Sequence, residues 1–197
     1  MPAATTNKAE GFHLFDTALG RCALLWRGGL VVGAALPEAD DGAMRRSLAR
    51  RFPGADEADP PGFVRSAAAA VARALAGERD ELAAIGVGFD GASEFDRRVW
   101  EATRAIPRGE VRSYGEVASA VGAPRAAQAV GLALGRNPVP ILVPCHRVLA
   151  SSGSGGFSAP GGAATKFRLL EIELAARAGD GTLFGRLPFA LRPAARE

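Results

Sequence analysis

A cysteine and a histidine stand side by side at the end of a proline-rich segment, in the run Pro144-Cys145-His146-Arg147-Val148. Pro138, Pro140 and Pro144 hinder a regular helix and favour a rigid, extended segment. A nearby histidine activates a thiol by offering positive charge or by taking its proton. Neighbouring side chains point in different directions, so the pattern favours proton transfer through a bridging water. A free cysteine is also commonly buried for packing alone, and that structural role stays open here.

The far ring nitrogen of His146 needs a partner that orients it, and a carboxylate is the natural one. Glu171 and Glu173 both lie on the next expected helix, Lys166–Arg177, whose Leu169, Leu170 and Leu174 are expected to face inward. Before this helix comes the glycine-rich loop Ser151–Gly162, a type of loop that lets a backbone approach a ligand closely. A plain connector is the alternative interpretation of the loop.

Two short helices are expected ahead of the cysteine segment. Ser113-Tyr114-Gly115-Glu116 has the form of a capping box and predicts a helix that stops at Gly122. Pro124 suits the first turn of a second helix that runs to about Gly135. Together they predict a helix-turn-helix. The second helix carries many small residues, which permit either close helix packing or close approach to DNA; composition alone favours packing.

The rest of the chain predicts an α/β (α+β) fold. A small N-terminal α/β scaffold domain is expected over residues 1–91, a mainly helical domain over 92–178 and a loose tail over 179–197. The first domain should contain a β-hairpin over Phe12–Pro37, turning at Arg27-Gly28-Gly29. Further expected elements are helices over Met44–Phe52 and Phe63–Ala76 (with Phe63 inward), a short strand at Ile85–Phe89 and a helix capped by Ser93.

Composition narrows the class of protein. With 48% hydrophobic and 23% charged residues, the 197-residue chain is ordinary for a globular protein. Its apolar runs are too short to cross a membrane, and it opens on no secretory signal, so a soluble, cytoplasmic protein is expected. Two cysteines and two histidines make no disulfide framework and leave little for zinc. Basic residues outnumber acidic ones only after about residue 91, which hints at a polyanionic partner or a solvated basic face.

Three segments carry a resemblance to a known family: Tyr114–Ala118, Gly135–Pro138 and, above all, Pro144–Val148. Over about residues 93–175 the chain resembles the O6-alkylguanine-DNA alkyltransferases, the methylated-DNA–protein-cysteine S-methyltransferases. The resemblance implies DNA repair by direct reversal, in which an alkylated guanine is flipped out of the duplex. Cys145 would then accept the alkyl group irreversibly, once per molecule. It also implies a monomer that binds double-stranded DNA through the minor groove and needs no cofactor and no metal.

The resemblance also assigns roles to individual residues. His146 would deprotonate Cys145 through water, and Glu173, favoured over Glu171 by the family spacing, would hold His146. Tyr114 would donate to the purine, and Asn137 would brace the helices against the cysteine segment. The substrate-binding set is Gln128, Val148, Phe157 and Ser158; the DNA-binding set is Ser113, Tyr114, Arg125, Ala126, Ala127, Gln128 and Arg136. The chemistry fits, because a thiolate is a good nucleophile for an O6-alkyl carbon, which becomes accessible only outside the base stack.

The chain departs from the family pattern in two places. Gln128 stands where an arginine usually fills the gap left by the flipped base, which predicts weaker DNA binding and slower transfer. Ala159-Pro160 is inserted before Gly161-Gly162. His13 and Cys22 do not reproduce the zinc site of some relatives. The alternatives are an alkyltransferase-like protein that binds lesions without removing them, a thiol hydrolase, and a transcriptional regulator that uses the helix-turn-helix alone.

Overall fold

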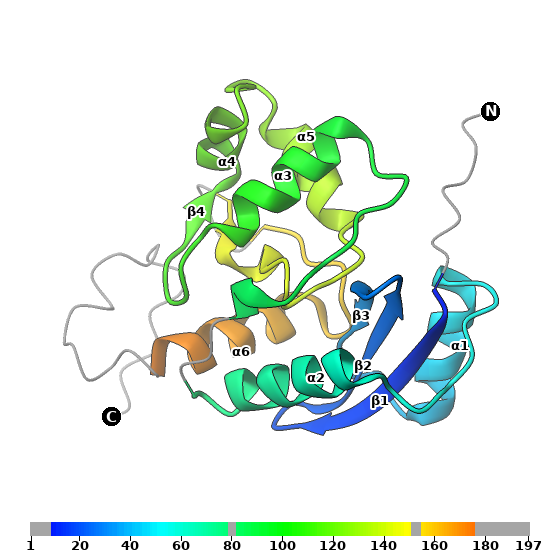
Figure 1. The fold of residues 1–197 in the computed structure, drawn as a ribbon. Coiled ribbons are helices and arrows are strands. Elements are labelled where there is room, and N and C mark those ends of the chain that lie inside the picture. Colours follow the sequence, from blue (N-terminus) through cyan, green and yellow to red (C-terminus); the bar gives the residue numbers. More distant parts are fainter. Residues whose placement is uncertain (1–8, 79–81, 151–154, 176–197) are drawn as a thin grey trace, which may run out of the picture.

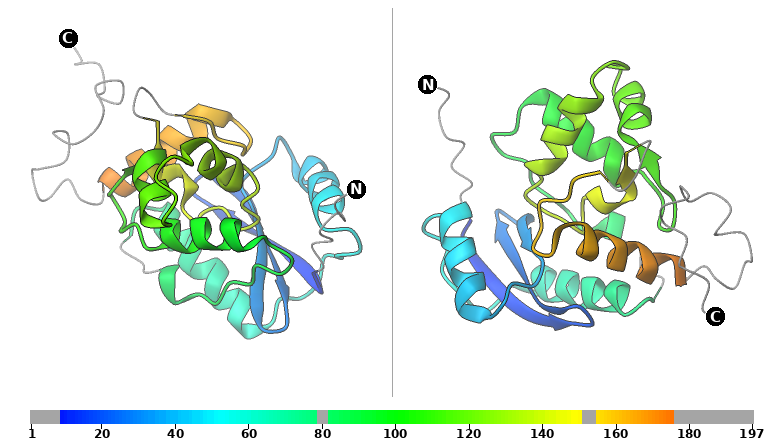
Figure 2. Two further views of the ribbon diagram at one scale, coloured as in Figure 1. Left: turned by 90° about the horizontal axis from the view of Figure 1, so that it is seen from above. Right: turned by 180° about the vertical axis from the view of Figure 1, so that it is seen from behind.

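The computed structural model describes residues 9–78, 82–150 and 155–175. Figure 1 shows two parts: a sheet flanked by α1 and α2 below, and the helices α3, α4 and α5 above. Helix α6 (Gly162–Ala175) returns from the upper part to lie beside α2, as both views in Figure 2 show. The mixed α/β class expected from the sequence is therefore confirmed.

The sheet has three antiparallel strands in the order β1 (Gly11–Thr17), β2 (Gly20–Arg27) and β3 (Leu30–Ala35). The tight turn between β2 and β3 is confirmed, and its two glycines have φ values of 56° and 81°. Positive φ at both central positions is what a two-residue hairpin turn requires, and glycine adopts it at low cost. The predicted single hairpin is incomplete, because β1 adds a third strand that pairs along the whole of β2.

Each face of the sheet packs against one helix. α1 (Asp41–Arg51) covers one face through Met44 and Leu48, while α2 (Gly62–Leu75) covers the other in a core that continues into the upper part of the molecule. The prediction that Phe63 faces the core is wrong: it sits in the first turn of α2 and is 38% exposed. The strand predicted at Ile85–Phe89 is reduced to a single bridge between Val31 and Val87, after the short 3-10 helix η1 (Leu82–Ala84).

The upper part is built on α3 (Glu94–Arg104), whose N-terminus Ser93 caps as predicted. Its Trp100 indole donates a hydrogen bond of 2.8 Å to the Ala133 carbonyl of α5 (Ala127–Gly135). α4 (Tyr114–Ala120) begins with the predicted capping box, complete in both directions between Ser113 and Glu116. α5 starts at Ala127 rather than at Pro124, because Pro124 and the next residue form a separate turn.

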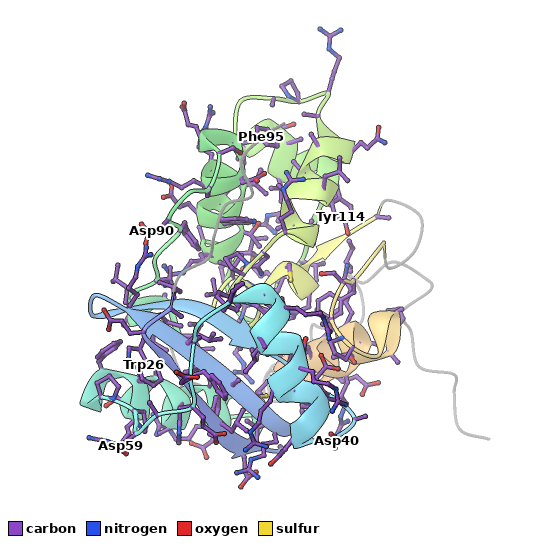
Figure 3. The ribbon with its side chains drawn as sticks, turned by 90° about the vertical axis from the view of Figure 1, so that its right-hand side faces the viewer. Trp26, Asp40, Asp59, Asp90, Phe95 and Tyr114 are labelled. Carbon is purple, nitrogen blue, oxygen red and sulfur yellow. The ribbon has the colours of Figure 1, made fainter. Side chains whose placement is uncertain are left out.

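A short parallel pairing brings the start of α4 to the cysteine segment. β4 (Arg112–Ser113) pairs with β5 (Val148–Leu149), which directly follows the 3-10 helix η2 (Cys145–Arg147). Figure 3 shows Tyr114 in this upper part of the molecule, well separated from Trp26 in the sheet. α6 begins four residues before its predicted start at Lys166; Leu169 and Leu170 are buried as predicted, and the Leu174 side chain lies outside the described residues.

Hydrogen bonds join the sheet to the segment that follows Asn137. The Ala34 amide of β3 donates a 2.9 Å hydrogen bond to the Pro138 carbonyl. Arg51, at the end of α1, donates to the carbonyls of Ala34 at 3.1 Å and Pro138 at 3.4 Å. Burial lowers the pKa of the Arg51 guanidinium, and the charge of Glu38 acts against this shift. The N-terminal part thereby holds the segment that follows Asn137.

Replacing Arg51 with methionine is expected to lower the free energy of unfolding by about 1–3 kcal/mol, because two hydrogen bonds from a charged donor are lost while the aliphatic stem is kept. Urea unfolding followed by circular dichroism measures the change. The matched control is Arg50→Met, on the same helix at an exposed position, which should shift the midpoint little. Equal midpoints for the two variants would contradict the importance of the Arg51 contact.

In the described ranges, no helix is long and apolar enough to span a membrane. The predicted loose tail over 179–197 and the first four residues of the glycine-rich loop fall outside those ranges.

Candidate active site

Cys145 opens the short helix η2 and is 8% exposed. Its Sγ receives a hydrogen bond of 3.5 Å from Nδ2 of Asn137, the residue next after the C-cap of α5. The same amide nitrogen donates to the Val143 carbonyl at 2.9 Å, while Asn137 Oδ1 accepts from the Val139 amide at 3.0 Å. Asn137 therefore fixes both ends of the proline-rich segment and points a donor at the sulfur.

The segment between Asn137 and Cys145 stores backbone strain. Ile141 has a φ of 76°, the only positive φ at a non-glycine residue in the described ranges. A β-branched residue in this region is a steric outlier that the surrounding structure must hold in place. The fixed ends at Asn137 and the bond from Ala34 to Pro138 provide that restraint. The extended conformation predicted from the prolines is wrong: the segment turns back on itself, with the Val143 amide bonded to the Val139 carbonyl and a bridge between Pro140 and Val143, before the 3-10 turn at the cysteine.

His146 points away from solvent and meets Glu173 of α6. Its Nε2 lies 2.8 Å from Glu173 Oε1, and the histidine is 2% exposed. Glu173 also receives hydrogen bonds from Nε of Arg147 at 3.0 Å and from its Nη2 at 2.7 Å, and from the Gly109 amide at 3.3 Å. Burial alone would raise the pKa of Glu173, but His146 and Arg147 outweigh it and hold that pKa well below its usual range. Glu171 instead forms an exposed ion pair with Arg168.

The remaining nitrogen of His146 is placed to act as a base. Because a carboxylate only accepts hydrogen bonds, Nε2 carries the proton and donates to Glu173, which leaves the lone pair on Nδ1. Nδ1 is buried, and no partner for it is found among the described residues. No hydrogen bond joins the His146 ring to the Cys145 sulfur in those residues either, as expected for adjacent side chains. A water between them is the arrangement that would use this nitrogen.

Lys166 of α6 is a functional candidate that the sequence analysis did not identify. Its side chain is fully buried, and its ammonium donates to the carbonyls of Val148 at 2.7 Å and Gly156 at 3.3 Å. Burial lowers the pKa of Lys166 to about 8, against the opposing influence of a Cys145 thiolate. Burial also raises the pKa of the Cys145 thiol, while the Asn137 amide and the Lys166 charge act to lower it. A lysine in a helix ordinarily indicates a solvated face, so its sequence position gave no signal.

Tyr114 closes the site from the side of α4. Its hydroxyl donates to the Gly156 carbonyl at 3.3 Å, and the Lys166 ammonium lies 5.8 Å from its ring centre. Burial raises the pKa of Tyr114, so the hydroxyl remains a proton donor at neutral pH. Gly155 has a φ of 68°, and a Cβ there would lie 2.6 Å from the tyrosine ring. A glycine is thus required where the loop passes the aromatic ring.

A cavity of about 780 Å³ lies in front of the sulfur. Its lining brings together the start of α4, the length of α5 and the loop before α6: Ser113, Tyr114, Gly115, Ala127, Gln128, Gly131, Leu132, Leu134, Gly135, Cys145, Ala150, Gly156, Phe157 and Ser158. A purine fits in this volume, which is typical of small-molecule sites. The thiol is therefore reachable from outside although its residue is largely buried.

Some predicted site residues lie apart from this cavity. Arg125 is exposed in the turn before α5, and Ala126 is the N-cap of that helix. Arg136 forms a two-pronged ion pair with Asp96 of α3, at 2.7 and 3.0 Å. Val148 is fully buried, and its carbonyl is occupied by Lys166. None of these four residues lines the cavity in front of Cys145.

A second cavity of about 950 Å³ lies between the sheet and the upper part and is also lined by Cys145. The inserted residues Ala159 and Pro160 line this cavity and not the first, whereas Phe157 and Ser158 line both. The insertion therefore lies on the side toward the sheet. Among the described residues, no group of histidine, cysteine or carboxylate side chains could hold a metal ion.

Fold and site together define an α/β protein with a candidate cysteine nucleophile in the lining of a cavity large enough to hold a purine. Residues 94–175 match the family model described as the DNA-binding domain of 6-O-methylguanine DNA methyltransferase. A methylated-DNA–protein-cysteine methyltransferase from Mycolicibacterium paratuberculosis is 48% identical over 122 residues, which is 57% of this chain and 73% of that relative.

Similar solved structures point to the same family as the sequence comparisons. The O6-methylguanine methyltransferase of Mycobacterium tuberculosis has a TM-score of 0.66 and 35% identity, over 88% of this chain and 98% of that one. The OGT protein of the same organism in complex with DNA has a TM-score of 0.65 and 33% identity, over 84% and 94% of the two chains. The chain belongs to the O6-methylguanine DNA methyltransferase family.

Proposed function

We propose that this chain is a methylated-DNA–protein-cysteine S-methyltransferase that repairs O6-alkylguanine in double-stranded DNA by direct reversal, one alkyl group per molecule. The observation that carries the proposal is the position of the Cys145 sulfur at the wall of a 780 Å³ cavity, with the paired His146 and Glu173 behind it. The names of its relatives and the DNA complex of one of them support the substrate class.

The proposed step is an in-line displacement. The Cys145 proton passes through a water to Nδ1 of His146, whose new charge Glu173 stabilises. The sulfur forms a bond to the alkyl carbon as the bond from that carbon to O6 breaks, and the electron pair goes to the guanine. Tyr114 donates a hydrogen bond to the purine as this charge grows, which makes the base a better leaving group. The product is a stable thioether, so no second turnover follows.

The access of the base to the sulfur requires extrusion from the duplex, because the reacting carbon is otherwise inside the base stack. α4 and α5 act as a helix-turn-helix whose second helix enters the minor groove, with Arg125, Ala126, Ala127 and Gln128 at its N-terminal end. The small residues of α5 allow its backbone to approach the DNA closely. Phe157 and Ser158 contact the extruded base. The protein acts as a monomer in the cytoplasm.

Intact-mass measurement after incubation with O6-methylguanine duplex tests the proposal. We expect a gain of one methyl group per protein molecule, which peptide mapping places on Cys145. Cys22→Ser is the matched control: Cys22 is the other cysteine of the chain, it is buried, and burial raises its thiol pKa to about 11. The Cys22→Ser variant should gain the same mass. Unchanged protein mass with tight lesion binding would instead support the lesion-binding alternative, and more than one methyl removed per molecule would contradict single turnover.

Gln128→Arg is expected to raise both affinity for duplex DNA and the rate of methyl transfer on duplex, by about threefold to tenfold. Gln128 is exposed at the start of α5 and lines the cavity, so an arginine there adds length and a positive charge next to the phosphates. Single-turnover kinetics on duplex and fluorescence anisotropy measure the two quantities. Gln128→Lys separates charge from shape; an unchanged rate in both variants would show that another group already fills the gap.

A further inference from the structure

α5 exposes one large apolar side chain that its own fold leaves uncovered. Leu132 is 60% exposed, more than the other exposed large hydrophobic residues of the described ranges, Leu30 at 40% and Phe63 at 38%. By contrast Val130 and Leu134 of the same helix are buried in the core. The fold therefore leaves the larger part of the Leu132 surface uncovered.

The position of Leu132 is on the rim of the cavity that contains Cys145. Gln128, Gly131, Leu132 and Gly135 all line it. Gln128 and Leu132 are four residues apart and share one helix face, and both are exposed. Gly131 and Gly135 carry no side chains, so Leu132 is the bulky apolar group that projects from this part of α5.

This arrangement suits a duplex from which one nucleotide has been extruded. Extrusion leaves a gap whose upper and lower walls are the flat apolar faces of the neighbouring bases, and proteins of the minor groove commonly insert an apolar side chain between base steps. A neutral glutamine at position 128 supplies polar contacts but little apolar area. A leucine one helical turn further along supplies that area.

We propose that Leu132 is an apolar wedge that contacts the base pairs flanking the extruded nucleotide and stabilises the opened duplex. The proposal rests on the proposed function, and it assigns part of the gap-filling task in this chain to a residue other than the one at position 128. Because the wedge acts on the duplex and not on the reacting atoms, its effect depends on the strandedness of the substrate.

The test compares Leu132→Ala with the control variant Leu30→Ala. Leu30 is an exposed leucine of the sheet that does not lie on α5 and does not line the cavity. Single-turnover methyl transfer is timed on an O6-methylguanine oligonucleotide as duplex and as single strand. We expect Leu132→Ala to slow transfer about tenfold on duplex and less than about twofold on single strand, where no base needs to be unstacked from a pair. Leu30→Ala should match the wild type on both, and Leu132→Met should keep most of the duplex rate.

A third substrate adds a readout that a loss of folding would not move. When the lesion lies opposite an abasic site, extrusion costs less, and the Leu132→Ala defect should shrink toward the single-strand value. Equal slowing on all three substrates, or no slowing on duplex, would overturn the wedge. Failure of the wild type to accept methyl from any of them would instead refute the proposed function.

Discussion

Glu173→Gln is expected to slow methyl transfer by about 10²–10⁴-fold at neutral pH. A glutamine at this position is neutral and can present either an oxygen or an NH2 group to Nε2 of His146. It therefore no longer fixes the proton on Nε2, and it no longer stabilises the imidazolium that forms when Nδ1 takes the thiol proton. The measurement is single-turnover transfer from duplex DNA, with protein integrity followed by circular dichroism.

Glu171→Gln is the control for this variant, because Glu171 lies two residues away on α6 and makes only an exposed ion pair with Arg168. It should transfer at the wild-type rate. Comparable rates for the two variants would show that His146 needs no carboxylate.

The Glu173→Gln substitution also changes how the stability of the protein responds to acid. The pKa of Glu173 is depressed in the fold, so its contribution to stability is fully present above its ordinary pKa of 4.5 and is lost as pH falls through its folded value. The Glu173→Gln protein lacks this contribution at all pH values. Its melting temperature should therefore lie below that of the wild type at neutral pH and approach it as pH falls below 4.5. Thermal melts across that range measure the convergence.

Lys166→Met is expected to reduce the reactivity of Cys145 by about tenfold at neutral pH, because the buried ammonium stabilises the thiolate. Alkylation by iodoacetamide in a Cys22→Ser background reports this directly and without DNA. The pH at which the alkylation rate reaches half its maximum should move upward in the variant. Arg168→Met, which removes an exposed cation from the same helix, should leave the profile in place. A profile that does not move in Lys166→Met would exclude an electrostatic role.

Stability gives a second signature of the buried lysine. Its pKa falls from 10.5 to about 8 in the fold, so between these values the unfolded state binds more protons and the contribution of Lys166 to stability rises with pH. The difference in melting temperature between the wild type and Lys166→Met should therefore shift in favour of the wild type as pH rises across that window.

Features encoded by a few consecutive residues were the ones the sequence predicted well. The Ser113–Glu116 capping box and the Ser93 cap depend on side chains that reach backbone amides three residues away, so their spacing alone determines them. The two glycines of the β2–β3 turn are equally local. The same holds for the expectation that Cys145 and His146 make no direct hydrogen bond, since it follows from the divergence of adjacent side chains.

Features that depend on distant contacts could not be predicted in this way. Burial of Lys166 is possible because its ammonium donates hydrogen bonds to two carbonyls from other segments. The periodic pattern of a helix does not indicate such partners. The pairing of β4 with β5 joins segments 36 residues apart along the chain, from Arg112 to Val148. The late start of α5 reflects a separate turn at Pro124, closed by a hydrogen bond from the Ala126 amide to the Ala123 carbonyl, which the sequence pattern did not distinguish from a first helical turn. The family resemblance supplied the role of Glu173, which residue patterns alone had left open between two glutamates.

The hydrogen bond from Trp100 to the carbonyl of Ala133 gives the protein a built-in optical probe. The chain has two tryptophans, so Trp26→Phe leaves Trp100 as the single tryptophan. Trp100 belongs to α3, and its indole is hydrogen-bonded to α5, the helix that carries Leu132. Any shift of α5 against α3 on engaging DNA changes the polarity around that indole, and hence its emission wavelength. Stopped-flow fluorescence of this variant can therefore time the engagement of the duplex separately from alkyl transfer to Cys145.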